Sequence, residues 1–288
     1  MNKKLLILGC GYSAQFISKL LIEKGWQVFG TTRSEEQLKK LQDLGISPIL
    51  WDDMSSLNKL LAQRCSVLSS IAPQGLIDDG LIAVLDLLKQ DFLKINCLVY
   101  LSSTGVYGDR KGGWVSEDSV IDAKTIQGKA RVTAEKKWIK LASAHNLPLF
   151  IFRIAGIYGP ARSIFDRIKA RKAQKIIKPN QYFNRIHVDD LAGAVCASLE
   201  NPNLAGIYNV ADDLPSPGSD VIDEATKLLK KPRLPAISFD DAKLSEMAGS
   251  FYLDSKRVSN KKLRYSLGYS LKYPTYISGL RSLMKNGF

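Results

Sequence analysis

The chain has 288 residues, of which 45% are apolar and 24% charged, a balance typical of a globular protein with a sizeable buried core. This composition excludes a disordered chain, and no apolar run approaches the roughly 20 residues that span a bilayer, so no membrane segment is predicted. Lysine and arginine exceed aspartate and glutamate by 41 − 28 = 13. These bases are spread along the chain without a zinc finger, an RNA-binding aromatic signature or a basic heptad region, which argues against nucleic acid as the partner.

The first ten residues, MNKKLLILGC, imitate a lipoprotein signal. Their apolar core, Leu5 to Leu8, is shorter than the about 7–15 residues of a signal peptide. The four cysteines show no C-x-x-C spacing, as expected of reduced thiols, and we predict a cytoplasmic protein. Cys10 is either a reactive thiol at a helix N-terminus or a buried, inert one, and we favour the second interpretation.

The first hundred residues alternate short apolar, β-branched runs with helical patterns. Strands are predicted at KLLIL, QVFGTT, SPILW, SVLSSIA and CLVYLSS, with helices such as EEQLKKLQDLG between them. Strands of about five residues joined by helices predict an α/β fold with a parallel sheet covered on both faces.

A predicted loop, residues 104–124, leads into a helix whose apolar stripe comprises Ala130, Ala134, Trp138 and Leu141. LPLFIFRIA predicts a sixth strand, after which the alternation of strands and helices loosens. The basic stretch DRIKARKAQKIIKP, from Asp166 to Pro179, is either a solvated helix face or a contact for an anionic substrate, and charge alone leaves both open.

The stretch LLILGCGYSAQ places Gly9, Gly11 and Ala14 in a G-x-G-x-x-A pattern between a strand and a helix. The first glycine permits a tight turn, the second lets the backbone approach a diphosphate, and the small third residue lets helix and strand pack closely. The N–H groups and positive dipole end of the helix then face the phosphates. We therefore predict that the backbone from Cys10 to Ala14 binds a dinucleotide.

The second predicted strand ends in GTTRS, without the acid that would bind the ribose 2′-OH of NAD. Arg33, with Thr31, Thr32 and Ser34 as hydroxyl donors, suits a 2′-phosphate instead, so NADP is predicted in preference to NAD. Asp52, after the third strand, is either a contact on the adenine side of the pocket or a turn-capping residue.

Six motifs follow one another along the chain: the glycine turn, YLSSTGVYGD, FRIAGIYGP, RIHVDDLAGAV, YNVADD and the terminal SNKKLRYSLGY…YPTYISGLRSL. In this order they resemble the extended short-chain dehydrogenase/reductase family, which includes nucleotide-sugar epimerases and dehydratases, and within it an atypical, YeeZ-like subgroup. The glycine turn departs from the common G-x-x-G-x-x-G by being one residue tighter.

The resemblance implies a Rossmann-like, doubly wound parallel sheet with a smaller, mostly C-terminal substrate lobe. Residues 1–158, with 186–212 returning to them, would form the NAD(P)-binding domain, and 159–185 with 213–288 the substrate lobe. It also implies a small-molecule substrate, a carbonyl compound or a sugar nucleotide, and the possibility of a homodimer. The coenzyme contacts we predict are Gly9, Gly11, Tyr12, Ser13, Ala14, Thr32, Arg33, Ser34, Asp52, Ile71, Ala72, Arg131 and Ala155.

The resemblance further places a catalytic Ser, Tyr and Lys at Ser103, Gln127 and Arg131. Glutamine cannot carry a proton and arginine stays charged, so the usual general acid is missing. The residues after Ser103 are Thr and Gly rather than Asp and Glu, which disfavours a dehydratase. An atypical NADP-dependent enzyme and a non-catalytic NADP(H)-binding module remain the two alternatives.

Other residues could replace the missing tyrosine. Tyr107 with Lys111 and Tyr252 with Lys256 have the four-residue spacing, and we interpret both pairs as coincidences. No spacing argument supports the remaining candidates, Tyr158, Asp109, Glu117 and Asp118.

The segment RIHVDD contains one histidine with no partner at metal-ligand spacing, so no metal site is predicted. We expect Asp189 or Asp190 to cap a helix that begins there.

Overall fold

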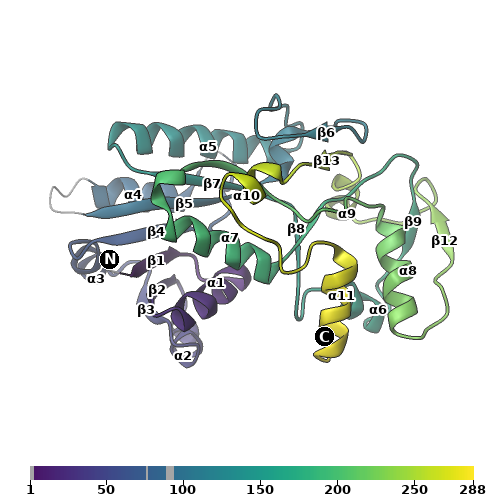
Figure 1. The fold of residues 1–288 in the computed structure, drawn as a ribbon, viewed down its shortest axis with the longest axis horizontal. Helices are drawn as coiled ribbons and strands as arrows, with labels where there is room; N and C mark the ends of the chain where they lie inside the picture. Colours follow the sequence, from purple (N-terminus) through teal and green to yellow (C-terminus); the bar gives the residue numbers. More distant parts are fainter. Residues whose placement is uncertain (1–2, 76, 89–93) are drawn as a thin grey trace.

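Seven parallel strands form the central sheet of the computed structural model, which describes residues 3–75, 77–88 and 94–288 (Figure 1). Their order across the sheet is β11-β7-β5-β4-β1-β2-β3. The strand order reverses between β1 and β4, which is where ligands bind in doubly wound folds. The bounds are β1 (Lys4–Leu8), β2 (Gln27–Thr32), β3 (Ser47–Leu50), β4 (Cys65–Ser69), β5 (Ile95–Ser103), β7 (Leu149–Ile154) and β11 (Gly206–Val210).

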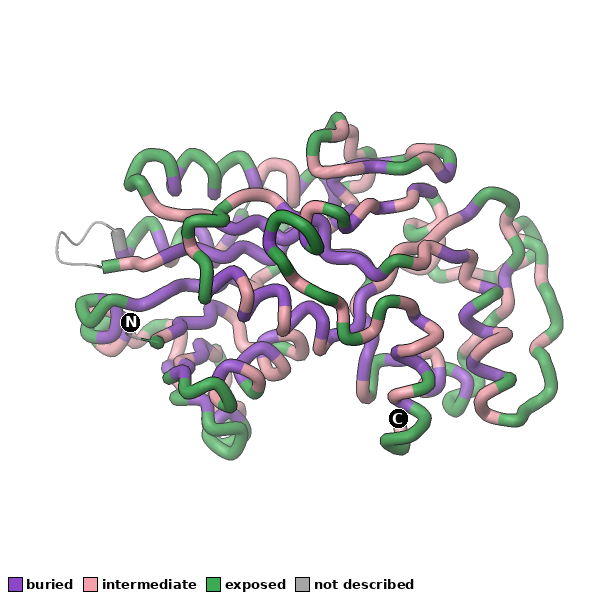
Figure 2. The backbone as a smooth tube through the Cα atoms, in the orientation of Figure 1, coloured by how far each residue is buried: buried purple, intermediate pink, exposed green. Residues whose placement is uncertain are grey.

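Helices cover both faces of this sheet because its strands are apolar on both sides. Leu5 and Ile7 of β1 pack into one cluster and Leu6 and Leu8 into another, as the two-residue period of a strand requires. Figure 2 shows the strands as the most continuously buried part of the chain. The doubly wound α/β fold is therefore confirmed. One face is covered by α1 (Tyr12–Glu23), α2 (Glu35–Asp43), α7 (Val188–Glu200) and α10 (Lys261–Tyr265), the other by α3 (Met54–Leu61), α4 (Asp79–Leu88) and α5 (Ile126–Ala144).

A second set of elements lies at one end of the sheet and has its own apolar core, to which Phe165, Ala225 and Leu280 belong (Figure 1). Three two-stranded parallel sheets accompany it, β8 with β10, β9 with β12 and β6 with β13. The bounds are β6 (Trp114–Val115), β8 (Gly156–Tyr158), α6 (Ile164–Lys169), β9 (Lys175–Ile177), β10 (Arg185–His187), α8 (Gly218–Leu228), β12 (Ala236–Ser238), α9 (Glu246–Ser250), β13 (Arg257–Val258) and α11 (Tyr276–Lys285), with 3₁₀ turns η1 (Thr104–Tyr107) and η2 (Pro202–Leu204).

The chain returns to the large sheet twice after entering this smaller lobe. In the first return, α7 packs against α1 and β11 pairs with β7. In the second, α10 packs against β11. Leu263 and Leu267, within the 213–288 range predicted for the substrate lobe, pack instead in the cluster on the α1 face of the sheet. The exact division into a coenzyme domain and a substrate lobe stays a prediction.

Within the described residues, none of the helices is both long and apolar enough to cross a membrane.

Candidate coenzyme and substrate site

The glycine turn after β1 has one strained and one open position. Gly9 has a φ of 81°, and a Cβ atom there would lie 2.7 Å from Ile71 Cγ1, so only glycine fits without a shift. Gly11 has an ordinary φ of −83°, and a Cβ atom built on it would meet no heavy atom within 4 Å. The backbone at Gly11 therefore faces open space, as the approach of a diphosphate requires.

Helix α1 begins directly after this open position, with Gly11 as its N-cap. The first N–H groups of a helix, here those of Tyr12, Ser13 and Ala14, have no partner within the helix and carry the positive end of its dipole. Ala14 is fully buried, so the helix lies close to the sheet. This arrangement fits the diphosphate of a dinucleotide, and the contacts of Tyr12, Ser13 and Ala14 with it stay predictions.

Two neighbouring segments hold the turn in place. The Gly9 N–H donates to Thr31 Oγ1 at 2.9 Å, and the Cys10 N–H donates to the Thr31 carbonyl at 3.2 Å. On the other side of β1, the Ser70 hydroxyl donates to the Gly9 carbonyl. Ile71 is half-buried beside Gly9, and Ala72 is exposed at the same edge of the sheet.

Burial raises the pKa of the Cys10 thiol to about 11, so the thiol is protonated at neutral pH and the inert interpretation is the better one.

Among the described residues, no group of three or more His, Cys, Asp or Glu side chains could hold a metal ion.

At the end of β2, the GTTRS segment divides into structural and exposed residues. Thr31 is buried, and its hydroxyl also donates to the Ile7 carbonyl at 3.3 Å, so its predicted role as a donor to a 2′-phosphate is wrong. Thr32 Oγ1 accepts the Ser34 N–H at 3.1 Å in a tight turn. Arg33 extends from this turn into an ion pair with Asp79.

Arg33 lies at a cavity of about 180 Å³ between the end of β1, the segment after β3, α3 and α4. Its guanidinium carbon is 5.3 Å from the centre of the Trp51 ring. Asp52 is exposed, and the cap of α3 is its neighbour Asp53, whose Oδ1 accepts the Ser56 N–H at 3.0 Å. The turn-capping role considered for Asp52 therefore belongs to Asp53. The cavity is lined by Leu8, Arg33, Trp51, Met54, Leu57, Asp79, Ile82, Ala83, Asp86 and Leu87.

Ser103 ends β5 at the same edge of the sheet as the glycine turn. Its Oγ accepts the Gly105 N–H at 3.1 Å, and a hydroxyl that accepts this bond still has its own proton to donate. The first turn of α5 packs against this segment, because a Cβ atom on Gly128 would lie 2.8 Å from the Gly105 carbonyl oxygen. Gln127 is exposed beside this contact.

Arg131 lies one turn further along α5 and turns toward β5. Its guanidinium donates to the Leu101 carbonyl at 2.6 Å and to the Tyr100 hydroxyl at 3.1 Å. Burial raises the pKa of Tyr100 to about 12, so this phenol is no proton carrier at neutral pH. The structure thus brings Ser103 and Arg131 to one corner of the sheet, with Gln127 at its rim.

Sequence reasoning missed a buried polar network below this corner. Glu135 and Arg153 form an ion pair with an N–O distance of 2.9 Å, and each is only 2% exposed. Ser102 Oγ donates to Glu135 at 2.6 Å, and Arg153 donates to the Tyr107 hydroxyl at 3.0 Å. Two signals were available in the sequence. Gln127, Arg131 and Glu135 follow at four-residue spacing, which places them on one helix face, and Arg153 is a charged residue inside an apolar strand.

Ala155, which follows Arg153 by two residues, is 6% exposed and packs with Val106, Val115 and Val258. Only a small part of the Ala155 side chain is therefore accessible for the predicted contact with a coenzyme.

Neither tyrosine–lysine pair lies within one helix, so the four-residue spacing does not bring either pair onto one helix face. Tyr107 ends the 3₁₀ turn η1 and Lys111 follows it, whereas Tyr252 and Lys256 both lie outside helices. The Tyr107 hydroxyl is buried and donates to Asn209 at 2.6 Å, while Lys111 lies in an exposed turn with a φ of 50°. Lys256 is buried and donates to the Gly108 carbonyl at 2.9 Å.

The other substitutes considered for the missing acid are buried, hydrogen-bonded or exposed. Burial raises the pKa of Tyr158 above its ordinary value, and its hydroxyl lies against Gly279 without a hydrogen-bond partner among the described residues. Asp109 accepts the Ser255 N–H at 2.8 Å, Glu117 accepts the Asn209 N–H at 2.7 Å, and Asp118 is exposed.

The cap of α7 differs from the prediction. His187, rather than Asp189 or Asp190, is the N-cap, and its Nδ1 accepts the Asp189 N–H at 3.2 Å. Burial lowers the pKa of His187 to about 4, which keeps the ring neutral and Nδ1 free to accept. Asp190 is fully buried and accepts the Tyr269 hydroxyl at 2.9 Å, so it anchors a distant loop instead.

A larger cavity, of about 530 Å³, lies in the smaller lobe between β8, β10, α6, α8, α9 and α11. It adjoins the glycine turn through Arg162, which lines the cavity and lies over the Tyr12 ring at 5.4 Å. The Tyr12 hydroxyl donates to the Pro160 carbonyl at 2.9 Å. The first residue of α1 therefore contacts the loop that borders the cavity.

The basic stretch after Asp166 divides between the cavity wall, packed pairs and exposed positions, and its contact with an anionic substrate stays a prediction. Arg167 lines the cavity, whereas Lys175 pairs with Asp223 at 2.7 Å and Lys178 lies over the Phe239 ring at 4.6 Å. Lys169 and Arg171 are exposed.

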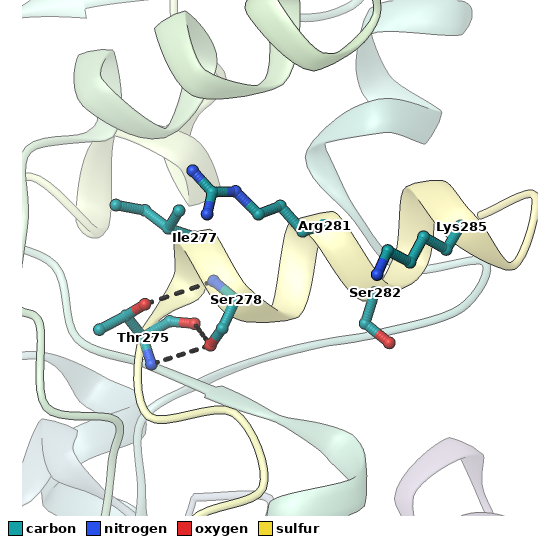
Figure 3. A pocket seen from close by; sticks show the side chains of 6 residues that line it. All are labelled: Thr275, Ile277, Ser278, Arg281, Ser282 and Lys285. Atoms are coloured by element: carbon teal, nitrogen blue, oxygen red, sulfur yellow. Dashed lines mark hydrogen bonds between the residues drawn. The ribbon is translucent and has the colours of Figure 1, made fainter.

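A third hollow follows one side of α11, where Figure 3 shows Arg281 and Lys285 on successive turns. Thr275 and Ser278 cap the helix reciprocally, and Arg281 lies 3.7 Å from Glu224. Because its side chains are occupied with capping and pairing and it shares no residue with the glycine turn, we do not assign it to the site.

Comparison with known proteins agrees with this geometry. The chain is 28% identical over 221 residues to Protein YeeZ of Escherichia coli strain K12, covering 72% of this chain and 77% of that protein. Its structure is similar to that of a functionally unknown conserved protein from Silicibacter pomeroyi DSS (TM-score 0.89, 40% identity, 99% of both chains). It shares its fold with the human epimerase family protein SDR39U1, solved with NADPH (TM-score 0.77, 16% identity, 98% of this chain and 99% of that one).

The model of the NAD dependent epimerase/dehydratase family matches residues 5–211, which include the glycine turn, Ser103 and α5. The chain therefore belongs to the NAD dependent epimerase/dehydratase family, and NAD(P) is the coenzyme that its membership leads us to expect.

Proposed function

We propose that this protein binds NADP(H) at the glycine turn and acts on a carbonyl compound or a sugar nucleotide in the adjoining cavity. The observation that carries the proposal is the open backbone at Gly11, which lies directly before α1 at the point where the strand order reverses. When bound there, a nicotinamide coenzyme supplies hydride transfer.

The residues of this chain would position the substrate beside it. Ser103 has a hydroxyl proton to donate to a substrate oxygen, and Gln127 can orient a carbonyl through its amide. Proton transfer would need water or a group of the substrate, because neither Gln127 nor Arg131 exchanges protons near pH 7.

A second candidate function is a non-catalytic NADP(H)-binding module. One observation favours it: the Arg131 guanidinium is engaged by the Leu101 carbonyl and the Tyr100 hydroxyl, although the family resemblance would give this position to a lysine that holds the coenzyme ribose.

Turnover separates the two functions. Purified protein would be offered NADPH with a panel of carbonyl compounds and sugar nucleotides, alongside S103A and the double variant Q127Y/R131K. Oxidation of NADPH that S103A abolishes supports the enzyme. If only the double variant turns substrate over, the native chain is a binding module.

We further propose NADP in preference to NAD. Arg33 supports this, since its guanidinium lies at the rim of the cavity of about 180 Å³ and β2 ends without an acid. The NADPH complex of human SDR39U1 is consistent with the same preference.

We also propose a homodimer formed through α4 and α5, which lie alongside each other (Figure 1). Ile82 and Leu85 of α4 and Ile139 of α5 are 46%, 42% and 42% exposed. Sedimentation of wild type and I139E tests this proposal: a dimer that the charge converts to a monomer supports it, and a wild-type monomer at all concentrations refutes it.

A further inference from the structure

Three segments of the smaller lobe carry much of the positive charge of the chain. Residues 166–178, 218–235 and 276–288 contain 12 lysines and arginines but 4 aspartates and glutamates, a net charge of 12 − 4 = +8. They are 44 of the 288 residues, and an even spread of the total of +13 would give them about +2. The excess charge is therefore local, although these segments lie far apart in the sequence.

The fold brings the ends of the three segments to one surface. β9 pairs with β12 in parallel, with Lys175 opposite Ala236, so the loops that precede both strands meet at the same edge. Ala173, Leu229 and Phe288, one from each segment, pack on the same apolar core. α6, α8 and α11 all end here, at the lower right of Figure 1, and Figure 2 shows these ends as exposed. Bases dispersed in the sequence, which argued against nucleic acid, thus meet on one surface.

Five basic side chains at these ends, which we call the basic surface, have no partner of their own. Each is exposed, and none of the five side chains makes a hydrogen bond or ion pair with another described residue: Lys169, Arg171, Lys172, Lys230 and Lys285. Three further bases lie at a neighbouring hollow that also contains three acids, so their charge is partly offset: Lys227, Lys231 and Arg233, with Asp220, Asp223 and Glu224.

The negative ends of the three helices do not account for this charge. A helix C-terminus carries about half a negative charge, so α6, α8 and α11 together contribute about −1.5. The three segments carry +8, several times what the helix ends need.

Two members of the basic surface stand where the backbone favours glycine. Arg171 and Lys230 directly follow the C-caps of α6 and α8, with φ values of 55° and 53° in the left-handed region. α1 and α2 have Gly25 and Gly45 at the same position, because glycine adopts a left-handed φ without a steric cost. The chain therefore has charged side chains at two positions where a neutral glycine would suit the helix end better.

We propose that the basic surface binds the phosphate backbone of a nucleic-acid duplex without reading its sequence. Lysine and arginine bind phosphates by releasing the counterions of the nucleic acid, which needs charge and no further specificity. The proposal is independent of the proposed function, because none of the five residues lines the glycine turn, the larger cavity or the cavity at Arg33.

The remaining side chains of these segments favour a duplex over other polyanions. The two aromatic residues, Tyr276 and Phe288, pack in the apolar core, so these segments offer no platform on which single-stranded bases could stack. Ile177 and Met284 are the large apolar side chains of the segments that are exposed, which is little apolar surface to insert into a membrane.

The test measures fluorescence anisotropy of a labelled DNA duplex of about 20 base pairs titrated with the full-length protein. R171G/K230G removes two charges and gives both positions the residue that their φ favours, so it should melt no lower than wild type. The control K40Q/K59Q removes two charges from exposed lysines on α2 and α3. K169Q/K285Q removes two other charges of the basic surface and keeps the inference testable should R171G/K230G fail to fold.

We expect wild type to bind the duplex at low salt with a Kd of about 10 μM or tighter, and both basic-surface variants to bind about tenfold more weakly. The slope of log K against log salt should become shallower by nearly 2 in each, since one lost phosphate contact removes about 0.9. K40Q/K59Q should stay within about twofold of wild type and keep its slope. Equal weakening in the control and the basic-surface variants, or no binding by wild type at about 100 μM protein, overturns the inference.

Two competitors decide whether the partner and the place are right. Vesicles of phosphatidylcholine and phosphatidylserine, added at the same phosphate concentration as the duplex, should not release it; release would assign the basic surface to a membrane and overturn the inference. Saturating NADPH should leave the affinity for the duplex unchanged, whereas displacement by NADPH would place the duplex at the coenzyme site and contradict it.

Discussion

Thr31 and Gly9 are joined by a hydrogen bond of 2.9 Å from the Gly9 N–H to the threonine hydroxyl, which itself donates to the Ile7 carbonyl. This buried hydroxyl connects β2 to the turn after β1, where Gly9 holds a left-handed φ. Thr31, which was predicted to contact the coenzyme, therefore holds the backbone of the glycine turn in the conformation proposed to bind it.

T31V should therefore destabilise the protein and weaken NADPH binding together. Valine has the same shape but leaves the Gly9 N–H without its acceptor, at a cost of about 1–3 kcal/mol. Urea unfolding and NADPH titration measure both effects. T32V is the control, because Thr32 is half-buried and water can replace its bond to the Ser34 N–H. Equal stability losses in the two variants would contradict the role given to Thr31.

The ion pair of Glu135 and Arg153 makes E135Q a severe substitution. Removing one charge leaves the other buried, which typically costs about 3–5 kcal/mol in the free energy of unfolding. D43N, which breaks the exposed pair of Lys39 and Asp43 on α2, should cost no more than about 0.5 kcal/mol. Comparable losses in urea unfolding of E135Q and D43N would show that the buried network is not the stabilising unit we describe.

Asp212 should make the free energy of unfolding fall as pH rises. Burial raises its pKa to about 7, partly offset by the Leu214 N–H and the Arg185 charge, while Asp213 raises it further. An unfolded aspartate titrates near 3.9, so between about pH 4 and 7 the folded state holds a proton that the unfolded state has lost. The stabilisation present below about pH 4 is therefore lost progressively up to pH 7.

D212N should remove this dependence, since asparagine keeps an oxygen for the Leu214 N–H and does not titrate. Urea unfolding of both proteins at pH 5 and 8 should show wild type losing more stability than D212N. The difference between the two proteins isolates Asp212 from His187, whose lowered pKa gives the opposite slope. Parallel pH profiles would refute the shift at Asp212.

Arg33 and Asp79 should set the preference between the two coenzymes. R33Q should weaken NADPH about tenfold or more and NADH much less, because it removes a charged partner for the 2′-phosphate. D79N should strengthen NADPH a few-fold, since it frees Arg33 from an exposed ion pair. E36Q is the control for D79N, because it removes one negative charge from the exposed face of α2. Equal effects of R33Q on both coenzymes would contradict this assignment.

The sequence predicted the sheet because its signals are local. Apolar strands with a two-residue period, as in Leu5 to Leu8, require cover on both faces, and helices lie between them. The glycine turn was recognisable because it needs residues without a side chain. Gly9 has a positive φ and a close neighbour, Gly11 leaves space open beside the backbone, and glycine at both positions can be read directly from the sequence.

Interactions between distant segments could not be predicted in the same way. Whether Thr31 faces a ligand or the Gly9 N–H depends on the register of β1 with β2. His187 is the residue before α7 and caps it, while Asp190 lies within the helix and accepts from Tyr269, a partner 79 residues away. The larger cavity is lined by segments from β8 to α11, so no single sequence motif predicts it.

The central claim is that backbone at Gly11 binds the diphosphate of NADP(H), and calorimetry on G11A tests it most directly. Neither Gly11 nor Gly249 has a heavy atom within 4 Å of a built Cβ, so G11A and the control G249A should both fold. We predict that wild type and G249A bind NADPH with similar affinity and that G11A loses at least about tenfold, because its methyl group enters the diphosphate site. Unchanged NADPH affinity in folded G11A, or no binding by wild type, would contradict the account.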